Sequence, residues 1–191
     1  MNDFTQISGN IRPGNSALFA LKSLLAHIGI KVTHPVADES FFYGSDIKSS
    51  WQRYDNELAF YHSIADSPFH IVYNDGEIDN EIGSQIVYAM LKNRPILMTG
   101  KPVFSSSLTP MIREILEKRM HYIHSINLPE LELAELSLLL AKLKPVDYCL
   151  SKGEKVLVNA RIKAHFRDLL KESESMRIER ARSPIRPTAE V

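Results

Sequence analysis

The sequence has a single cysteine, no long apolar run and no excess of charge of either sign. Cys149 alone cannot form an intramolecular disulfide or a cysteine-rich zinc site, so a reducing compartment is expected. No apolar run approaches the ~20 residues that span a bilayer, and no basic-then-apolar segment opens the chain as an export signal does. These features predict a cytoplasmic protein with no membrane partner.

The charges are balanced. Lys and Arg together number 23, and Asp and Glu together also number 23. A net charge near zero argues against non-specific coating of nucleic acid as the main task of the protein. The apolar share of 44% and the charged share of 24% are those of an ordinary globular chain. We therefore expect no nucleic-acid partner.

The chain length and a change in composition predict the domain organisation. A chain of 191 residues is long enough for one domain with an appended tail. From Ser173 onward the composition turns to Arg, Glu, Ser and Pro, which favours disorder. We therefore expect a single α/β domain over residues 1–172 and a disordered polar tail over residues 173–191.

Strand-like and helix-like segments alternate along the first half of the chain. The apolar patterns predict strands near residues 4–8, 31–34, 69–73 and 95–98. They predict helices near residues 16–28, 51–65, 79–92 and 111–118. This alternation predicts a doubly wound α/β fold, Rossmann-like or flavodoxin-like, with a parallel sheet, helices on both faces and further C-terminal helices.

The second half has a looser pattern. A fifth strand is predicted near residues 121–126, a short strand near 155–158 and a final helix near 160–170. Pro129 is expected at the first position of a leucine-rich helix. That helix either packs against the core of its own chain or forms a subunit interface.

Polar residues follow the predicted strands at the edge where ligands bind in doubly wound folds. Ser8, Gly9 and Asn10 follow the first strand, and an acidic loop over residues 74–80 follows the third. The acidic loop permits two interpretations. It is part of a ligand site, or its carboxylates simply complement the N-terminus of the next helix.

Short motifs in residues 4–100 resemble the nucleoside 2-deoxyribosyltransferase family. Ile7-Ser8-Gly9, followed by a helix, Gly29, a strand and Pro35, resembles the opening of that family. The stretch 72–79, Val-Tyr-Asn-Asp-Gly-Glu-Ile-Asp, followed by Tyr88-Ala89 and the segment 95–97, resembles its central part. The resemblance implies a protein that binds a nucleoside or nucleotide and cleaves or transfers at its N-glycosidic bond.

The same resemblance implies site residues and assembly. Such enzymes form a covalent sugar ester with a carboxylate, so they need polar groups that orient the sugar. Members commonly complete their pockets with a neighbouring subunit, which implies a homo-oligomer, and no cofactor or metal is implied. The implied substrate-binding residues are Ser8, Gly9, Asn10, Asp75, Gly76, Asp79 and Gln85, with Asp79 expected to hold a sugar hydroxyl.

The nucleophile is where this chain departs from the family. Its position, counted back from Tyr88-Ala89 and Pro95, falls on Gln85, whose amide is too weak a nucleophile. Glu81 lies four residues earlier on the same helical face, and Glu81-Ile82-Gly83 repeats the family's Glu-x-Gly pattern one turn early. Glu81 is therefore the candidate catalytic residue. The alternative is a non-catalytic ligand-sensing or assembly module of the same fold.

Overall fold

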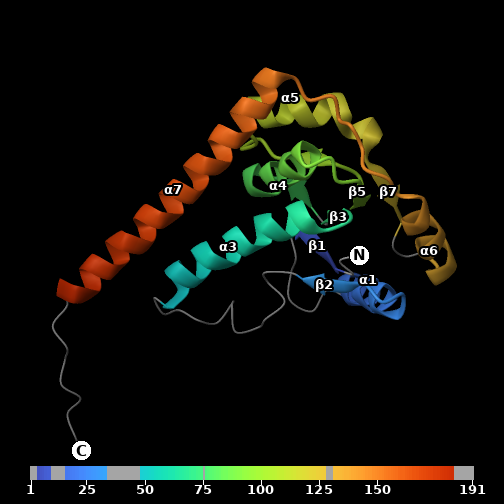
Figure 1. Cartoon of the computed structure of the whole chain (residues 1–191), viewed down its shortest axis with the longest axis horizontal. Helices are drawn as coiled ribbons and strands as arrows, with labels where there is room; N and C mark the ends of the chain where they lie inside the picture. Colours follow the sequence, from blue (N-terminus) through green and yellow to red (C-terminus); the bar gives the residue numbers. More distant parts are fainter. Residues whose placement is uncertain (1–3, 10–15, 34–47, 75, 128–130, 183–191) are drawn as a thin grey trace, which may run out of the picture.

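The computed structural model describes residues 4–9, 16–33, 48–74, 76–127 and 131–182. A five-stranded sheet with the order β2-β1-β3-β5-β7 forms its centre (Figure 1). All neighbouring strands in it are parallel, which confirms the predicted sheet. Its strands are β1 (Phe4–Gly9), β2 (Lys31–Thr33), β3 (His70–Tyr73), β5 (Ile96–Thr99) and β7 (His124–Ile126).

Helices cover both faces of this sheet, as predicted. On one face, Ile71 and Leu97 pack in a cluster with apolar residues of α1 (Ser16–His27) and α6 (Leu133–Lys142). On the other face, Val72 and Met98 pack against α3 (Lys48–Asp66), α4 (Asn80–Leu91) and α5 (Pro110–Arg119). Successive residues of a strand point to opposite faces, so one strand supplies both clusters. Every residue of β3 and β5 is buried, as expected for central parallel strands.

The leucine-rich helix α6 begins at Leu133 and not at Pro129, so the predicted start was wrong. Glu132 holds an extended backbone as its N-cap, and residues 128–130 lie outside the described part of the chain. Leu136 is fully buried, and Leu139, Leu140 and Leu143 pack partly buried against the same cluster. The helix thus packs against its own domain, and the homo-oligomer stays a prediction.

The last helix, α7 (Lys152–Arg182), is a single element of 31 residues that lies along α3 (Figure 1). The strand predicted at 155–158 and the helix end predicted at 170 were therefore wrong. The expected disorder was wrong for residues 173–182, and residues 183–191 lie outside the described part. Packing explains the difference, because Leu169 and Ser173 are buried and the Ser173 hydroxyl donates to the Leu169 carbonyl at 2.9 Å.

Some short elements were not predicted. A second, two-stranded parallel sheet joins β4 (Glu77–Ile78) to β6 (Val103–Phe104). A 3-10 turn, η1 (Met120–Tyr122), takes the place of the first half of the strand expected at 121–126. Within the described ranges, no helix combines the length and apolarity needed to cross a membrane.

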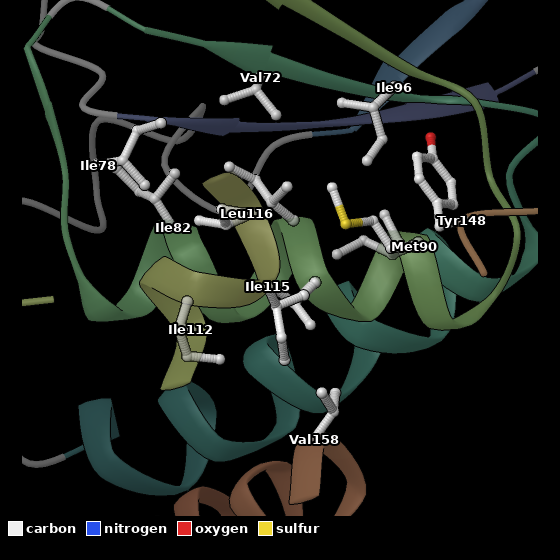
Figure 2. Close-up of a cluster of buried hydrophobic side chains, with 14 of the residues drawn as sticks. Val72, Ile78, Ile82, Met90, Ile96, Ile112, Ile115, Leu116, Tyr148 and Val158 are labelled. Carbon is white, nitrogen blue, oxygen red and sulfur yellow. The ribbon is translucent and has the colours of Figure 1, made fainter. Parts of the chain in front are cut away.

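One continuous core joins the sheet to α7. Figure 2 shows Val72 and Ile96 of the sheet facing Ile82 and Met90 of α4, and beyond α5 lies Val158 of α7. Val158 is almost completely buried, whereas its neighbours Val156 and Leu157 are exposed. The start of α7 is therefore attached to the domain by a narrow apolar contact.

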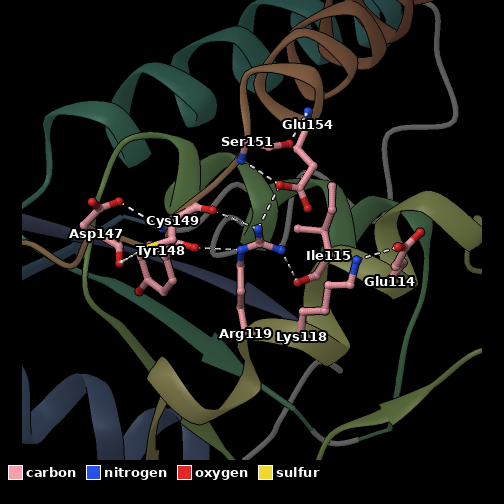
Figure 3. A network of polar contacts seen from close by, with 9 residues as sticks. All are labelled: Glu114, Ile115, Lys118, Arg119, Asp147, Tyr148, Cys149, Ser151 and Glu154. Carbon is pink, nitrogen blue, oxygen red and sulfur yellow. Dashed lines mark hydrogen bonds and ion pairs between the residues drawn. The ribbon is translucent and has the colours of Figure 1, made fainter.

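Polar contacts around Arg119 hold the start of α7 in place (Figure 3). From the end of α5, the Arg119 guanidinium donates to the Tyr148 carbonyl at 2.7 Å and to the Cys149 carbonyl at 3.2 Å. It also forms an ion pair with Glu154 in the first turn of α7 at 2.8 Å. Because Arg119 is only 7% exposed, these contacts operate with little competition from water.

The partner carboxylate also caps α7. Glu154 accepts from the Ser151 backbone N–H at 2.7 Å, and the Ser151 hydroxyl accepts from the Glu154 N–H at 3.2 Å, which is a capping box. Burial alone would raise the pKa of Glu154, but the hydrogen bonds from Ser151 and Arg119 outweigh it and lower that pKa. One carboxylate thus begins the helix and fixes it to α5.

Replacing Arg119 tests this attachment. Arg119→Met should lower the free energy of unfolding by about 3 kcal/mol, because it removes the ion pair with Glu154 and the hydrogen bonds to the Tyr148 and Cys149 carbonyls. Lys118→Met is the matched control, since it removes only the exposed Lys118–Glu114 pair and should cost less than about 1 kcal/mol. Urea denaturation of both variants measures the difference, and equal losses would contradict the assigned role.

Candidate functional site

The order of the strands reverses between β1 and β3, at the edge formed by their carboxyl ends. Gly9 ends β1 there with a φ of +145°. A Cβ at Gly9 would lie 1.9 Å from the Tyr73 carbonyl oxygen, so only glycine permits this close approach of the two strand ends. This close approach explains why position 9 is a glycine, independently of the ligand contact that the sequence predicted there.

The Ser8 side chain points to the sheet face covered by α3 and α4, and not toward that edge. Its hydroxyl lies 2.9 Å from Nε2 of His70, and both residues are buried. Burial lowers the pKa of His70 to about 3, so its ring is neutral at neutral pH. Nδ1 of the same ring has no hydrogen-bond partner. The Ser8–His70 pair is a buried polar contact of the sheet face covered by α3 and α4.

The acidic loop supplies a helix cap. The Asp79 carboxylate accepts from the backbone N–H groups of Glu81 and Ile82 at 3.0 and 2.9 Å, at the start of α4. This geometry corresponds to the helix-complementing interpretation of the loop. Gly76 is exposed in the same loop, whereas Asn10 and Asp75 lie outside the described residues.

Glu81 and Gln85 have different surroundings although they lie one turn apart on α4. Gln85 is 7% exposed and belongs to the buried side of the helix. Glu81 is exposed and lines a cavity of about 330 Å³ between α3, α4 and α7. Of the site residues predicted from sequence, Glu81 is the one among the described residues that lines this cavity. The others that do so are Tyr61, Asn80, Ser84, Arg161, Ile162, Ala164, His165 and Asp168.

Hydrogen bonds arrange the polar wall of the cavity. Arg161 of α7 donates through Nε to the Ser84 hydroxyl at 3.1 Å, and that hydroxyl donates to the Asn80 carbonyl at 2.6 Å. The Asn80 side chain is itself fixed, because its Oδ1 accepts from both the N–H and the hydroxyl of Thr109. Elsewhere on the wall, Nε2 of His165 contacts the Glu57 carboxylate of α3. These contacts join α7 to α4 through Arg161 and to α3 through His165.

Tyr61 lines the floor of the cavity and belongs to an aromatic cluster. The Tyr61 ring packs edge-on against Tyr88 at 5.0 Å and against Phe166 at 5.3 Å between centroids. Burial raises the pKa of Tyr61 far above its usual value, the charges of Glu57 and Glu81 raise it further, and Arg161 partly offsets them. The phenol therefore stays protonated at neutral pH and can donate a hydrogen bond.

Sequence reasoning missed the contribution of α7 to this cavity. Arg161 meets Ser84 across 77 positions of the chain, and His165 meets Glu57 across 108. No motif spans such separations, and the segment around Arg161 and His165 read only as a final helix. Among the described residues, no group of three or more His, Cys, Asp or Glu side chains could hold a metal ion.

The neutral state of His70 predicts a dependence of stability on pH. An unfolded histidine titrates near pH 6.5, so between pH 6.5 and about 3 the unfolded chain binds more protons at this position. The contribution of His70 is thus fully present above pH 6.5 and decreases by up to about 1.4 kcal/mol per pH unit below it. His70→Gln, which can keep a hydrogen bond to Ser8, should flatten this slope in urea denaturation between pH 5 and 7.5.

The exposed His124 provides the control for this measurement. His124→Gln should keep the wild-type slope, because this substitution leaves the buried His70 in place. A slope for His70→Gln equal to that of wild type would show that His70 does not cause the loss of stability in acid.

Comparisons of the chain with protein-family models, with curated proteins and with solved structures give no match. The site is therefore interpreted from its own geometry.

Proposed function

We propose that this chain binds a nucleoside or nucleotide in the cavity between α3, α4 and α7. The observation that carries the proposal is the cavity itself, whose volume of about 330 Å³ lies in the range of small-molecule sites. Its walls offer donors and acceptors from Asn80, Ser84 and Arg161, and the lining also includes Tyr61, which is only 5% exposed. These polar groups suit the hydrogen-bonding atoms of a nucleoside base and its sugar.

A second candidate function, cleavage of the N-glycosidic bond, is favoured by the position of Glu81 in the same cavity. A carboxylate oxygen there would form a bond to the anomeric carbon as the bond from that carbon to the base nitrogen breaks. The departing base would take a proton, and water would then hydrolyse the sugar ester. Asp79 and Gln85 do not belong to the lining, so among the described residues Glu81 is the one implied site residue that lines the cavity.

Binding and cleavage can be measured on the same samples. Calorimetric titration with 2′-deoxynucleosides and their 5′-monophosphates should detect binding to the wild-type chain. Chromatography of the incubated mixtures should detect free base if Glu81 is a nucleophile. Glu81→Gln should then abolish base release and retain binding, because the amide keeps the size of the side chain but cannot form the ester.

Glu117→Gln is the matched control, since Glu117 is exposed on α5 outside the cavity. It should leave both binding and base release unchanged. Binding without base release would identify a binding module, and base release that survives Glu81→Gln would contradict the cleavage mechanism. No binding of any nucleoside or nucleotide would contradict the proposed function.

A further inference from the structure

The charged side chains around the cavity differ in whether they have an oppositely charged partner. His165 forms an ion pair with Glu57, and Asp168 lies 3.9 Å from both Arg167 and Lys171. Glu81 also makes an interaction of its own. Each carboxylate on or behind the cavity wall therefore already has an interaction within the protein.

Arg161 is different. Its Nε is occupied by Ser84, but no described carboxylate forms a salt bridge with its guanidinium. The side chain is only partly exposed, so its terminal amino groups lack both a carboxylate and full access to water. A buried or half-buried charge is stabilised by pairing, which makes this guanidinium a receptor for an anionic group.

The anchoring of Arg161 also limits its motion. Because the Ser84 hydroxyl holds Nε and is itself bonded to the Asn80 carbonyl, the guanidinium plane is fixed relative to the first turns of α4. Arg161 and Tyr61 line the same cavity. A planar fork that is fixed in this way matches two oxygens of a phosphate, and less ordering entropy is lost on binding.

We infer that Arg161 binds the phosphate of the ligand, so that this cavity selects a nucleoside monophosphate over the uncharged nucleoside. The inference rests on the proposed function and names the ligand class of that same site. The groups that face Arg161 include the carboxylates of Glu81 and Asp168, which would repel a phosphate placed beside them. Asp168 is largely exposed and lies near two cations, so its repulsion of a phosphate is screened. The phosphate would therefore lie next to the guanidinium of Arg161.

Matched variants on α7 test the inference. Wild-type chain should bind 2′-deoxynucleoside 5′-monophosphates about ten- to hundredfold more tightly than the corresponding nucleosides in calorimetric titration at low salt. Arg161→Met should lower monophosphate affinity much more than nucleoside affinity, so that the two affinities become equal. Lys163→Met is the control, because Lys163 is exposed on the same helix and does not line the cavity. It should keep the wild-type preference.

Thermal unfolding of each variant shows that it is folded, and Arg161→Lys provides a second variant that keeps the positive charge. Arg161→Lys should recover part of the preference, because it restores the charge without the planar fork. A wild-type chain that binds nucleosides as tightly as monophosphates would overturn the inference and leave the proposed function standing. Equal affinity for inorganic phosphate and for the monophosphates would support the role of Arg161 but contradict the proposed function.

Discussion

The ion pair between Arg119 and Glu154 fixes the start of the last helix in the described part of the chain. It acts where α7 begins, next to a narrow apolar contact made by Val158, and the same carboxylate caps the helix. α7 continues unbroken over 31 residues and packs along α3, so the anchored first turn and these contacts together set its direction. That direction brings Arg161 and His165 over α3 and α4. The cavity therefore depends on a contact that lies outside it.

The architecture separates the features that usually coincide in a doubly wound fold. The strand order reverses between β1 and β3, and the carboxyl ends of those strands are brought together by a close approach at Gly9. The described cavity, however, is lined entirely by residues of the helices α3, α4 and α7. Glu81 lines this cavity, whereas Asp79, two positions earlier, caps α4. The start of one helix thus combines a capping carboxylate with one that lines a cavity.

The pattern of buried polar groups follows the same division. His70 and Ser8 pair with each other inside the sheet–helix layer, where burial keeps the histidine neutral. Tyr61 is also kept neutral by burial, but it belongs to the lining of the cavity. Arg161 is the charged counterpart, held by a neutral hydroxyl and not by a carboxylate. A neutral anchor orients the guanidinium without neutralising it.

Local patterns in the sequence determined the sheet. Apolar runs such as 69–73 and 95–98, separated by amphipathic helices, permit few arrangements other than parallel strands with helices on both faces, and the structure has this arrangement. The predictions from local pattern were wrong where packing decides. The segment 155–158 contains β-branched valines and reads as a strand, but the capping box of Ser151 and Glu154 starts a helix just before it. Residues 173–182 read as a disordered tail, but contacts with the domain stabilise the helix that precedes them.

The candidate site divides in the same way. The sequence by itself singled out Glu81 through its spacing from Gln85 and placed it on the first turn of a helix, where the structure also has it. Only the tertiary structure decided what surrounds that carboxylate, because Tyr61, Arg161 and His165 come from helices far apart in the chain. Helix propensity and apolar period are properties of neighbouring residues, so they can be read locally. The wall of a cavity is a property of how helices pack, and it exists only once α7 has been fixed against α5.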